Sequence, residues 1–124
     1  MSNSQPIVTI VDDDLSVRET LSVILKSVGY LPRVFSSVEE LLDSGELKDA
    51  SCLLTDISMP GMDGWDLHCY ATVMYPHLPI IMMTGDLQAT PKYKTTKCPM
   101  ILYKPVPIQD LLNAIAVPLN RIAC

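Results

Sequence analysis

The chain has 124 residues, of which 48% are hydrophobic and 19% are charged. This length and composition suit one domain with its own core, and they exclude an intrinsically disordered chain. The formal net charge of −5, with no cluster of Lys and Arg, argues against direct contact with nucleic acid or an anionic membrane.

Short apolar runs alternate with amphipathic stretches along the chain. The pattern predicts five strands, at Ile7–Val11, Leu31–Phe35, residues 51–55, residues 79–83 and Met100–Tyr103. A helix that ends at Gly29 is predicted after the first strand, and a short helix through Leu42 after the second. Further helices are predicted at residues 65–74 and from Pro107. Residues 59–64 are predicted to form a turn-rich loop before the helix at residues 65–74.

Residues that favour helix ends mark several of these boundaries. Asp14 precedes the first helix and is predicted to be its N-cap. Ser37 and Glu40 have the spacing of a capping box, in which each side chain binds the other residue's backbone N–H. Pro118 is expected to bend or end the last helix, because proline has no N–H to donate.

The alternation of strands and helices predicts an α/β fold with a doubly wound, five-stranded parallel sheet and right-handed crossovers. Residues 51–55 are apolar on both faces, as a central parallel strand should be. Residues 86–99 contain two prolines and no clean helical stripe, so the fourth helix region is expected to be atypical. A sheet of this kind binds ligands at the carboxyl ends of its strands.

Polar residues follow four of the predicted strands, at the ends where such a site would lie. Asp12 and Asp13 follow the first strand, and Asp56 follows the third. Thr84 and Lys104 follow the fourth and fifth strands. Clustered carboxylates repel one another unless a cation neutralises them, and oxygen ligands without a His or Cys cluster favour Mg²⁺. A carboxylate beside Mg²⁺ can attack phosphorus, and Asp56 is the best candidate for this nucleophile.

Four motifs resemble those of the receiver domain of two-component response regulators, which has a flavodoxin-like fold. They are VDDD at residues 11–14, LTDISMPGMDG at residues 54–64, MTG at residues 83–85 and YKP at residues 103–105. The match covers essentially the whole chain, so we expect a single receiver domain over residues 1–124 with no output domain.

The resemblance implies a role for each of several site residues. They are Asp12 and Asp13 as the acidic pair that binds Mg²⁺, Asp56 as the phosphoacceptor and a further ligand, the Ser58 backbone carbonyl as another ligand, and Thr84 and Lys104 as partners of the phosphoryl group. It also implies a cis peptide bond between Lys104 and Pro105.

The function expected from this resemblance is a phosphoacceptor switch and not an enzyme. A histidine kinase or phosphotransfer protein would donate the phosphoryl group, and a downstream protein target would read the change, with no direct role for nucleic acid or membrane. Residues 86–99 are expected to carry the output. No stretch approaches the roughly 20 apolar residues that span a bilayer, and the first six residues show no basic region followed by an apolar one, so we expect a cytoplasmic protein.

Two alternative functions remain open at this point. One is a receiver-like docking module with vestigial phosphorylation, which is favoured by Ile101, where the family usually has an aromatic residue, and by Pro91 in the segment of residues 86–99. The other is a Mg²⁺-dependent phosphatase that forms an aspartyl phosphate. In that class the nucleophile motif comes near the chain start, whereas here the order is reversed and Ser58 stands where a second aspartate would be.

Other chemically active side chains carry no motif. The four cysteines show no CxxC pairing, so neither a zinc site nor a redox pair is expected and the thiols should be reduced. His68 is expected on a helix surface and His77 in a loop, whereas Trp65 is expected to pack in the core.

Overall fold

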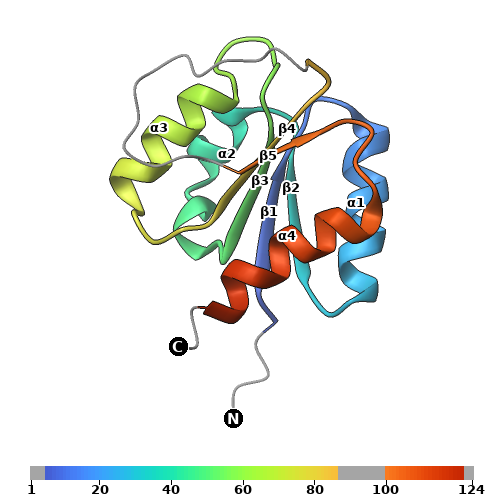
Figure 1. The fold of residues 1–124 in the computed structure, drawn as a ribbon. Helices are drawn as coiled ribbons and strands as arrows, with labels where there is room; N and C mark the ends of the chain where they lie inside the picture. Colours follow the sequence, from blue (N-terminus) through green and yellow to red (C-terminus); the bar gives the residue numbers. More distant parts are fainter. Residues whose placement is uncertain (1–4, 87–99, 122–124) are drawn as a thin grey trace.

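The computed structural model describes residues 5–86 and 100–121 (Figure 1). Its centre is a five-stranded, all-parallel sheet with the strand order β2-β1-β3-β4-β5. The strands are β1 (Ile7–Val11), β2 (Leu31–Phe35), β3 (Cys52–Asp56), β4 (Ile80–Thr84) and β5 (Met100–Tyr103). The predicted sheet is confirmed, and β3 and β4 each lie one residue further along the chain than predicted. The expected atypical helix region lies outside the described residues from residue 87 to residue 99.

Four α-helices and one 3₁₀ helix are described between and after the strands. They are α1 (Leu15–Ser27), α2 (Val38–Ser44), η1 (Glu46–Asp49), α3 (Gly64–Met74) and α4 (Ile108–Arg121). The predicted helices are confirmed, and η1 was not predicted. Within the described parts of the chain, none of these helices has the length and apolar character needed to cross a membrane.

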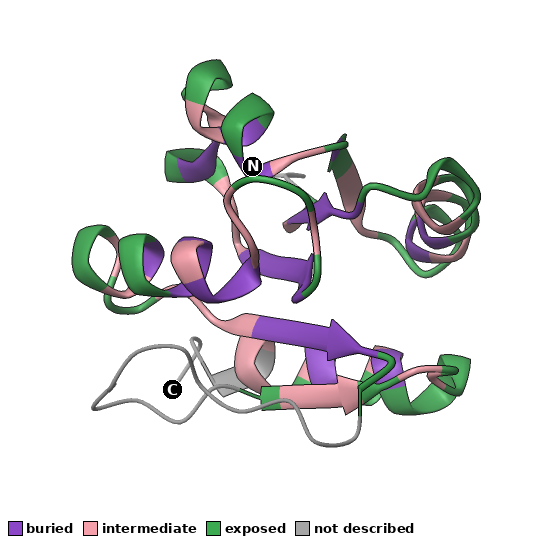
Figure 2. Cartoon of the chain, turned by 90° about the horizontal axis from the view of Figure 1, so that it is seen from above, coloured by how far each residue is buried: buried purple, intermediate pink, exposed green. Residues whose placement is uncertain are grey.

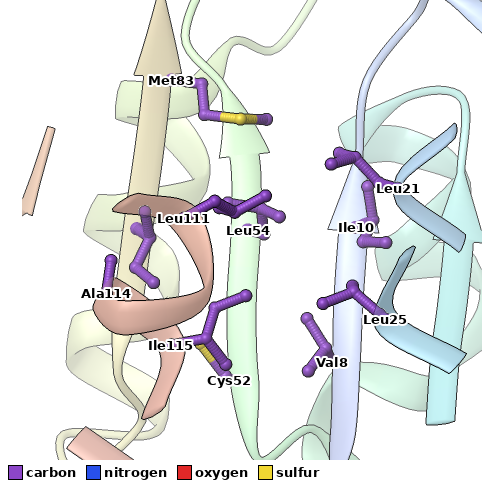
Figure 3. Packing of buried hydrophobic residues seen from close by; sticks show 11 residues of the cluster. Val8, Ile10, Leu21, Leu25, Cys52, Leu54, Met83, Leu111, Ala114 and Ile115 are labelled. Atoms are coloured by element: carbon purple, nitrogen blue, oxygen red, sulfur yellow. The ribbon is translucent and has the colours of Figure 1, made fainter. Parts of the chain in front are cut away.

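The sheet lies between two apolar layers because successive residues of a strand point to opposite faces. On one face, Val8, Ile10 and Leu54 of β1 and β3 pack against α1 and α4 (Figure 3). On the other face, Val11 and Leu53 pack against α2 and α3. All five residues of β3 are buried, and Figure 2 shows the buried positions concentrated in the central strands and on the sheet-facing sides of the helices.

The helix ends confirm two predicted caps and correct a third contact. The Asp14 carboxylate accepts the Ser16 N–H at 2.9 Å, and Ser37 Oγ accepts the Glu40 N–H at 3.0 Å. The Glu40 carboxylate, however, accepts the N–H of Ser36 at 2.6 Å, one residue before the one that a capping box requires. The predicted capping box is therefore only half formed.

Pro118 lies inside α4, which continues to Arg121, so this proline does not end the helix, and the expected bend stays a prediction. The φ angle of proline is compatible with a helix, but Pro118 loses the bond to the carbonyl of residue 114 and its ring crowds that carbonyl, both near the helix end. The apolar face of α4, with Leu111 and Ile115 buried against the sheet, holds the helix in place despite that loss.

The prediction that His68 lies on a helix surface is also wrong. Its side chain is buried, and its ring meets Trp65 edge to face with centroids 6.1 Å apart. Residues three apart lie on the same side of a helix, so the burial of Trp65, which was predicted, brings His68 inward with it. His77 is exposed beyond α3, as expected.

We expect Cys69 to react with iodoacetamide in the folded protein, and Cys52 to react only after unfolding. Both are free thiols, but Cys69 is exposed on α3, whereas Cys52 is buried in β3. Burial raises the pKa of the Cys52 thiol to about 12, so very little thiolate forms near neutral pH. Peptide mapping after alkylation with and without urea measures both sites. Equal labelling of Cys52 and Cys69 without urea would contradict the buried position of β3.

Candidate functional site

The four predicted polar strand ends meet at one edge of the sheet. Asp12 directly follows β1, and Asp56 is the last residue of β3, which is the neighbour of β1. Asp56 is in register with Met83, so Thr84 lies one position beyond it on β4. Thr84 is in register with Tyr103, the last residue of β5, and Lys104 directly follows that strand. Sheet order and register therefore bring together residues from four separate segments.

Three carboxylates form an acidic group at this edge. Asp12, Asp13 and Asp56 each offer an oxygen atom, and these oxygens lie within 4.8 Å of one another. Asp12 and Asp56 are buried, whereas Asp13 is exposed. Asp12 Oδ1 accepts the backbone N–H of Asp14 at 2.9 Å, which fixes the orientation of the most buried of these carboxylates.

The ammonium group of Lys104 lies between two of these carboxylates. Its Nζ is 3.4 Å from Asp12 Oδ2 and 3.3 Å from Asp56 Oδ2. The Lys104–Pro105 peptide bond is cis, as the resemblance implied. About a third of the Lys104 side chain remains exposed, so the ammonium can also be reached by an anion from solvent.

Burial and the neighbouring charges together shift the pKa values of Asp56 and Lys104. Desolvation raises the pKa of Asp56 above its usual range, the Lys104 ammonium opposes that shift, and the nearby Asp12 adds to it. Burial alone would lower the pKa of Lys104, but the adjacent carboxylates of Asp56 and Asp12 raise it. Three carboxylates outnumber the Lys104 ammonium, so a divalent cation would relieve their repulsion. Hard oxygen donors of this kind fit Mg²⁺.

Of the remaining predicted residues, Thr84 is the last residue of β4 and Ser58 lies in the loop after β3. Thr84 is buried at the end of β4, and its Oγ1 accepts the backbone N–H of Asp86 at 3.0 Å. Ser58 is exposed, two residues after Asp56 in the loop that joins β3 to α3. The role of its carbonyl oxygen as a ligand stays a prediction.

Sequence reasoning missed two charged residues that hold the loops of this site. Arg18 Nη1 donates to the backbone carbonyl of Asp12 at 2.7 Å, and Glu39 Oε2 accepts the backbone N–H of Met62 at 3.0 Å. Their sequence positions, in the first turns of predicted helices, carry no signal of these contacts. Arg18 reaches back only six residues, to the residue directly after β1, whereas the Glu39 bond spans 23 residues and needs the folded chain to bring its two segments together.

Gly64 was recognised only as a turn residue, and the structure shows why the site needs it. A Cβ at this position would lie 2.5 Å from the carbonyl oxygen of Asp56 and 2.8 Å from Cα of Ile57. The Gly64 N–H also donates to the Ile57 carbonyl at 2.9 Å. The first turn of α3 can therefore approach the end of β3 closely only because residue 64 has no side chain.

The amino-acid sequence is similar to a known family of domains and to named proteins. The sequence profile described as response regulator receiver domain matches residues 8–116. The chain is 33% identical over 122 residues to nodulation protein W of Bradyrhizobium diazoefficiens, covering 97% of this chain and 54% of that protein. It is 32% identical over 125 residues to the transcriptional regulatory protein FixJ of Azorhizobium caulinodans, covering 99% of this chain and 59% of that protein.

Solved structures show the same likeness. A CheY-like response regulator receiver domain protein from Methanospirillum hungatei superposes with a TM-score of 0.80 at 28% identity, covering 95% of this chain and 96% of that one. A receiver domain protein from Clostridium thermocellum gives a TM-score of 0.81 at 25% identity, with coverage of 95% and 97%. The chain spans little more than half the length of nodulation protein W and of FixJ.

Proposed function

Because this chain belongs to the response regulator receiver domains, we propose that it is a phosphoacceptor switch in which the Asp56 carboxylate takes up a phosphoryl group. The observation that carries the proposal is the position of the Lys104 ammonium, 3.3 Å from Asp56 within the group of three carboxylates. This arrangement places a cation beside the carboxylate that would receive a negatively charged group.

In the proposed reaction, an Asp56 oxygen forms a bond to phosphorus. The bond from phosphorus to the donor atom breaks at the same time, and its electron pair leaves with the donor. Asp12, Asp13 and Asp56 would hold Mg²⁺, together with the Ser58 carbonyl. When bound, Mg²⁺ would neutralise charge on the phosphoryl oxygens.

Lys104 and Thr84 would stabilise the product. The Lys104 ammonium lies within reach of Asp56 and would pair with a phosphoryl oxygen once that carboxylate is phosphorylated. The Thr84 hydroxyl already accepts the Asp86 N–H, and a hydroxyl can also donate its own proton to such an oxygen. A shift of Thr84 towards the phosphoryl group would carry Asp86 with it, which is the proposed start of the output signal.

The proposed partners are a histidine kinase or phosphotransfer protein as donor and a downstream protein as target. The chain would act as a stoichiometric acceptor and not as an enzyme with a separate substrate. The two matched regulators are about twice as long as this chain, so their activities as whole proteins are not assigned to it. The absence of direct nucleic-acid binding stays a prediction from the net charge of −5.

Treatment with acetyl phosphate and MgCl₂ should increase the intact mass by one phosphoryl group. Asp56→Asn should show no increase, because an amide oxygen is a poor nucleophile, and an excess of EDTA should abolish the increase in the wild type. Asp14→Asn serves as a matched control, since Asp14 lies at the same edge but caps α1, and this variant should be phosphorylated normally. Undiminished phosphorylation of Asp56→Asn would refute the assignment of the acceptor.

A further inference from the structure

The loop between β3 and α3, residues 57–63, is tied down at its base and at its tip. At the base, the Ile57 N–H donates to the Met83 carbonyl at 2.9 Å, and the Ile57 carbonyl accepts the Gly64 N–H at 2.9 Å. At the tip, the Met62 N–H donates to Glu39 Oε2 at 3.0 Å. Glu39 belongs to the first turn of α2, 23 residues away in sequence. A carboxylate from another helix therefore holds the far end of this loop.

Two further features show that the loop is shaped around the Glu39 carboxylate. A Cβ on Gly61 would lie 2.5 Å from Glu39 Oε2, so this glycine lets the backbone approach the carboxylate closely. Gly61 also has a φ of +75°, which disfavours other residues. The bond from Met62 holds the pKa of Glu39 below its usual range, so the carboxylate is charged near neutral pH and remains a strong acceptor.

The loop that Glu39 holds lies next to the proposed phosphoacceptor. The loop begins directly after Asp56 in β3, and Ser58 lies on it between the base and the tip. Met59 and Met62 are only partly buried against the core, so the bond to Glu39 adds a directional restraint that these apolar contacts do not supply. The bond to Glu39 fixes the tip in one place and so restricts the orientation of the carbonyl groups between residues 57 and 62.

We propose that Glu39 is a positioning residue, which holds the loop of residues 57–63 in the conformation that completes the cation site of Asp12, Asp13 and Asp56. This inference rests on the proposed function, since it assigns Glu39 a part in cation binding at the same site. Glu39 does not touch the cation. It acts through the backbone of the loop, and its loss weakens binding because the loop must then be ordered when the cation arrives.

Glu40 provides a matched control in the same turn of α2. It is exposed like Glu39 and carries the same charge, but its carboxylate accepts the N–H of Ser36 at 2.6 Å and makes its contact away from the loop. Glu40→Ala therefore removes one negative charge and one helix-end contact while leaving the loop tied. Glu39→Gln removes the charge but keeps an amide oxygen that can accept the Met62 N–H.

The test is calorimetric titration of MgCl₂ into the wild type, Glu39→Ala, Glu39→Gln and Glu40→Ala, with circular dichroism to check folding. Glu39→Ala should weaken Mg²⁺ affinity about ten-fold, the lower end of the effect of outer-shell partners. Glu39→Gln should recover most of that loss, and Glu40→Ala should bind within about two-fold of the wild type, although removal of its cap lowers the urea midpoint. Hydrogen exchange of the Met62 amide should be fast only in Glu39→Ala.

The Mg²⁺ titrations give different results if the proposed function fails and if only the role of Glu39 fails. No Mg²⁺ binding by the wild type would refute the proposed function itself. Normal binding by the wild type and by Glu39→Ala would overturn the role of Glu39 and leave the proposed function intact. Equal weakening in Glu39→Ala and Glu40→Ala would also overturn it, because the effect would then come from the loss of surface charge. Weakening confined to Glu39→Ala, with rescue in Glu39→Gln, supports the proposal.

Discussion

Gly64→Ala should lower the free energy of unfolding by about 3 kcal/mol, the upper end of the usual cost of overpacking. The new Cβ would lie 2.5 Å from the Asp56 carbonyl oxygen and 2.8 Å from Cα of Ile57. Both are backbone atoms of the segment that carries the proposed phosphoacceptor, so neither can move aside as a flexible side chain would. Relief of the clash requires the start of α3 to move away from β3. Urea denaturation followed by far-UV circular dichroism measures the loss.

Gly85→Ala is the matched control for this substitution. Gly85 follows β4 at the same edge of the sheet, but a Cβ there has no heavy atom within 4 Å. We expect its free energy of unfolding to stay within about 0.5 kcal/mol of the wild type, as for most surface substitutions. Equal stability of Gly64→Ala and Gly85→Ala would show that α3 does not approach β3 as closely as described.

Asp13→Ala should lower Mg²⁺ affinity about 100-fold, whereas Lys104→Ala should raise it about three-fold. Asp13 offers a carboxylate oxygen to the acidic group and is exposed, so its removal should cost binding without damaging the core. Lys104 lies 3.4 Å from Asp12 and 3.3 Å from Asp56, where it competes with a cation for these carboxylates. Loss of a partly exposed ion pair of this kind changes affinity only modestly.

Calorimetric titration with MgCl₂ measures both affinities, and beryllofluoride, a phosphoryl mimic, separates the two roles further. Lys104→Ala should bind Mg²⁺ yet lose the beryllofluoride-dependent change in hydrogen exchange, because the ammonium that pairs with the mimic is gone. Lys48→Ala, which removes a lysine from η1, is the control for net charge and should match the wild type. Similar losses of Mg²⁺ affinity in Asp13→Ala and Lys104→Ala would contradict this division of roles.

The agreement between the predicted and observed elements has a local cause. Each strand is a short apolar run bounded by turn residues, and each helix has apolar residues at helical spacing. Asp14 and Ser37 act as caps through backbone groups two or three residues away, so their roles can be predicted from neighbouring residues. The one-residue shifts of β3 and β4 arise because pairing with the adjacent strand decides where a strand ends.

The errors concern features that the neighbouring residues do not decide. Pro118 is a strong local signal for a helix end, but the packing of α4 on the sheet carries the helix past it. His68 is polar, which favours the surface, but its place one turn after Trp65 on α3 takes it inside. Tertiary packing overrides a local preference when the buried apolar area is worth more than the single contact that is lost.

In the candidate site, too, some features follow from the local sequence and others from tertiary packing. The sequence by itself determined which residues follow each strand, and the rule for parallel sheets predicted that Asp12, Asp56 and Lys104 would meet at one edge. The tertiary structure alone decided the strand order, the register and the position of Lys104 between two carboxylates, one of them 92 residues away in sequence. It also decided that Glu39 holds the loop after Asp56. Distances between such remote groups depend on how the helices pack the strands together, and no local pattern encodes that arrangement.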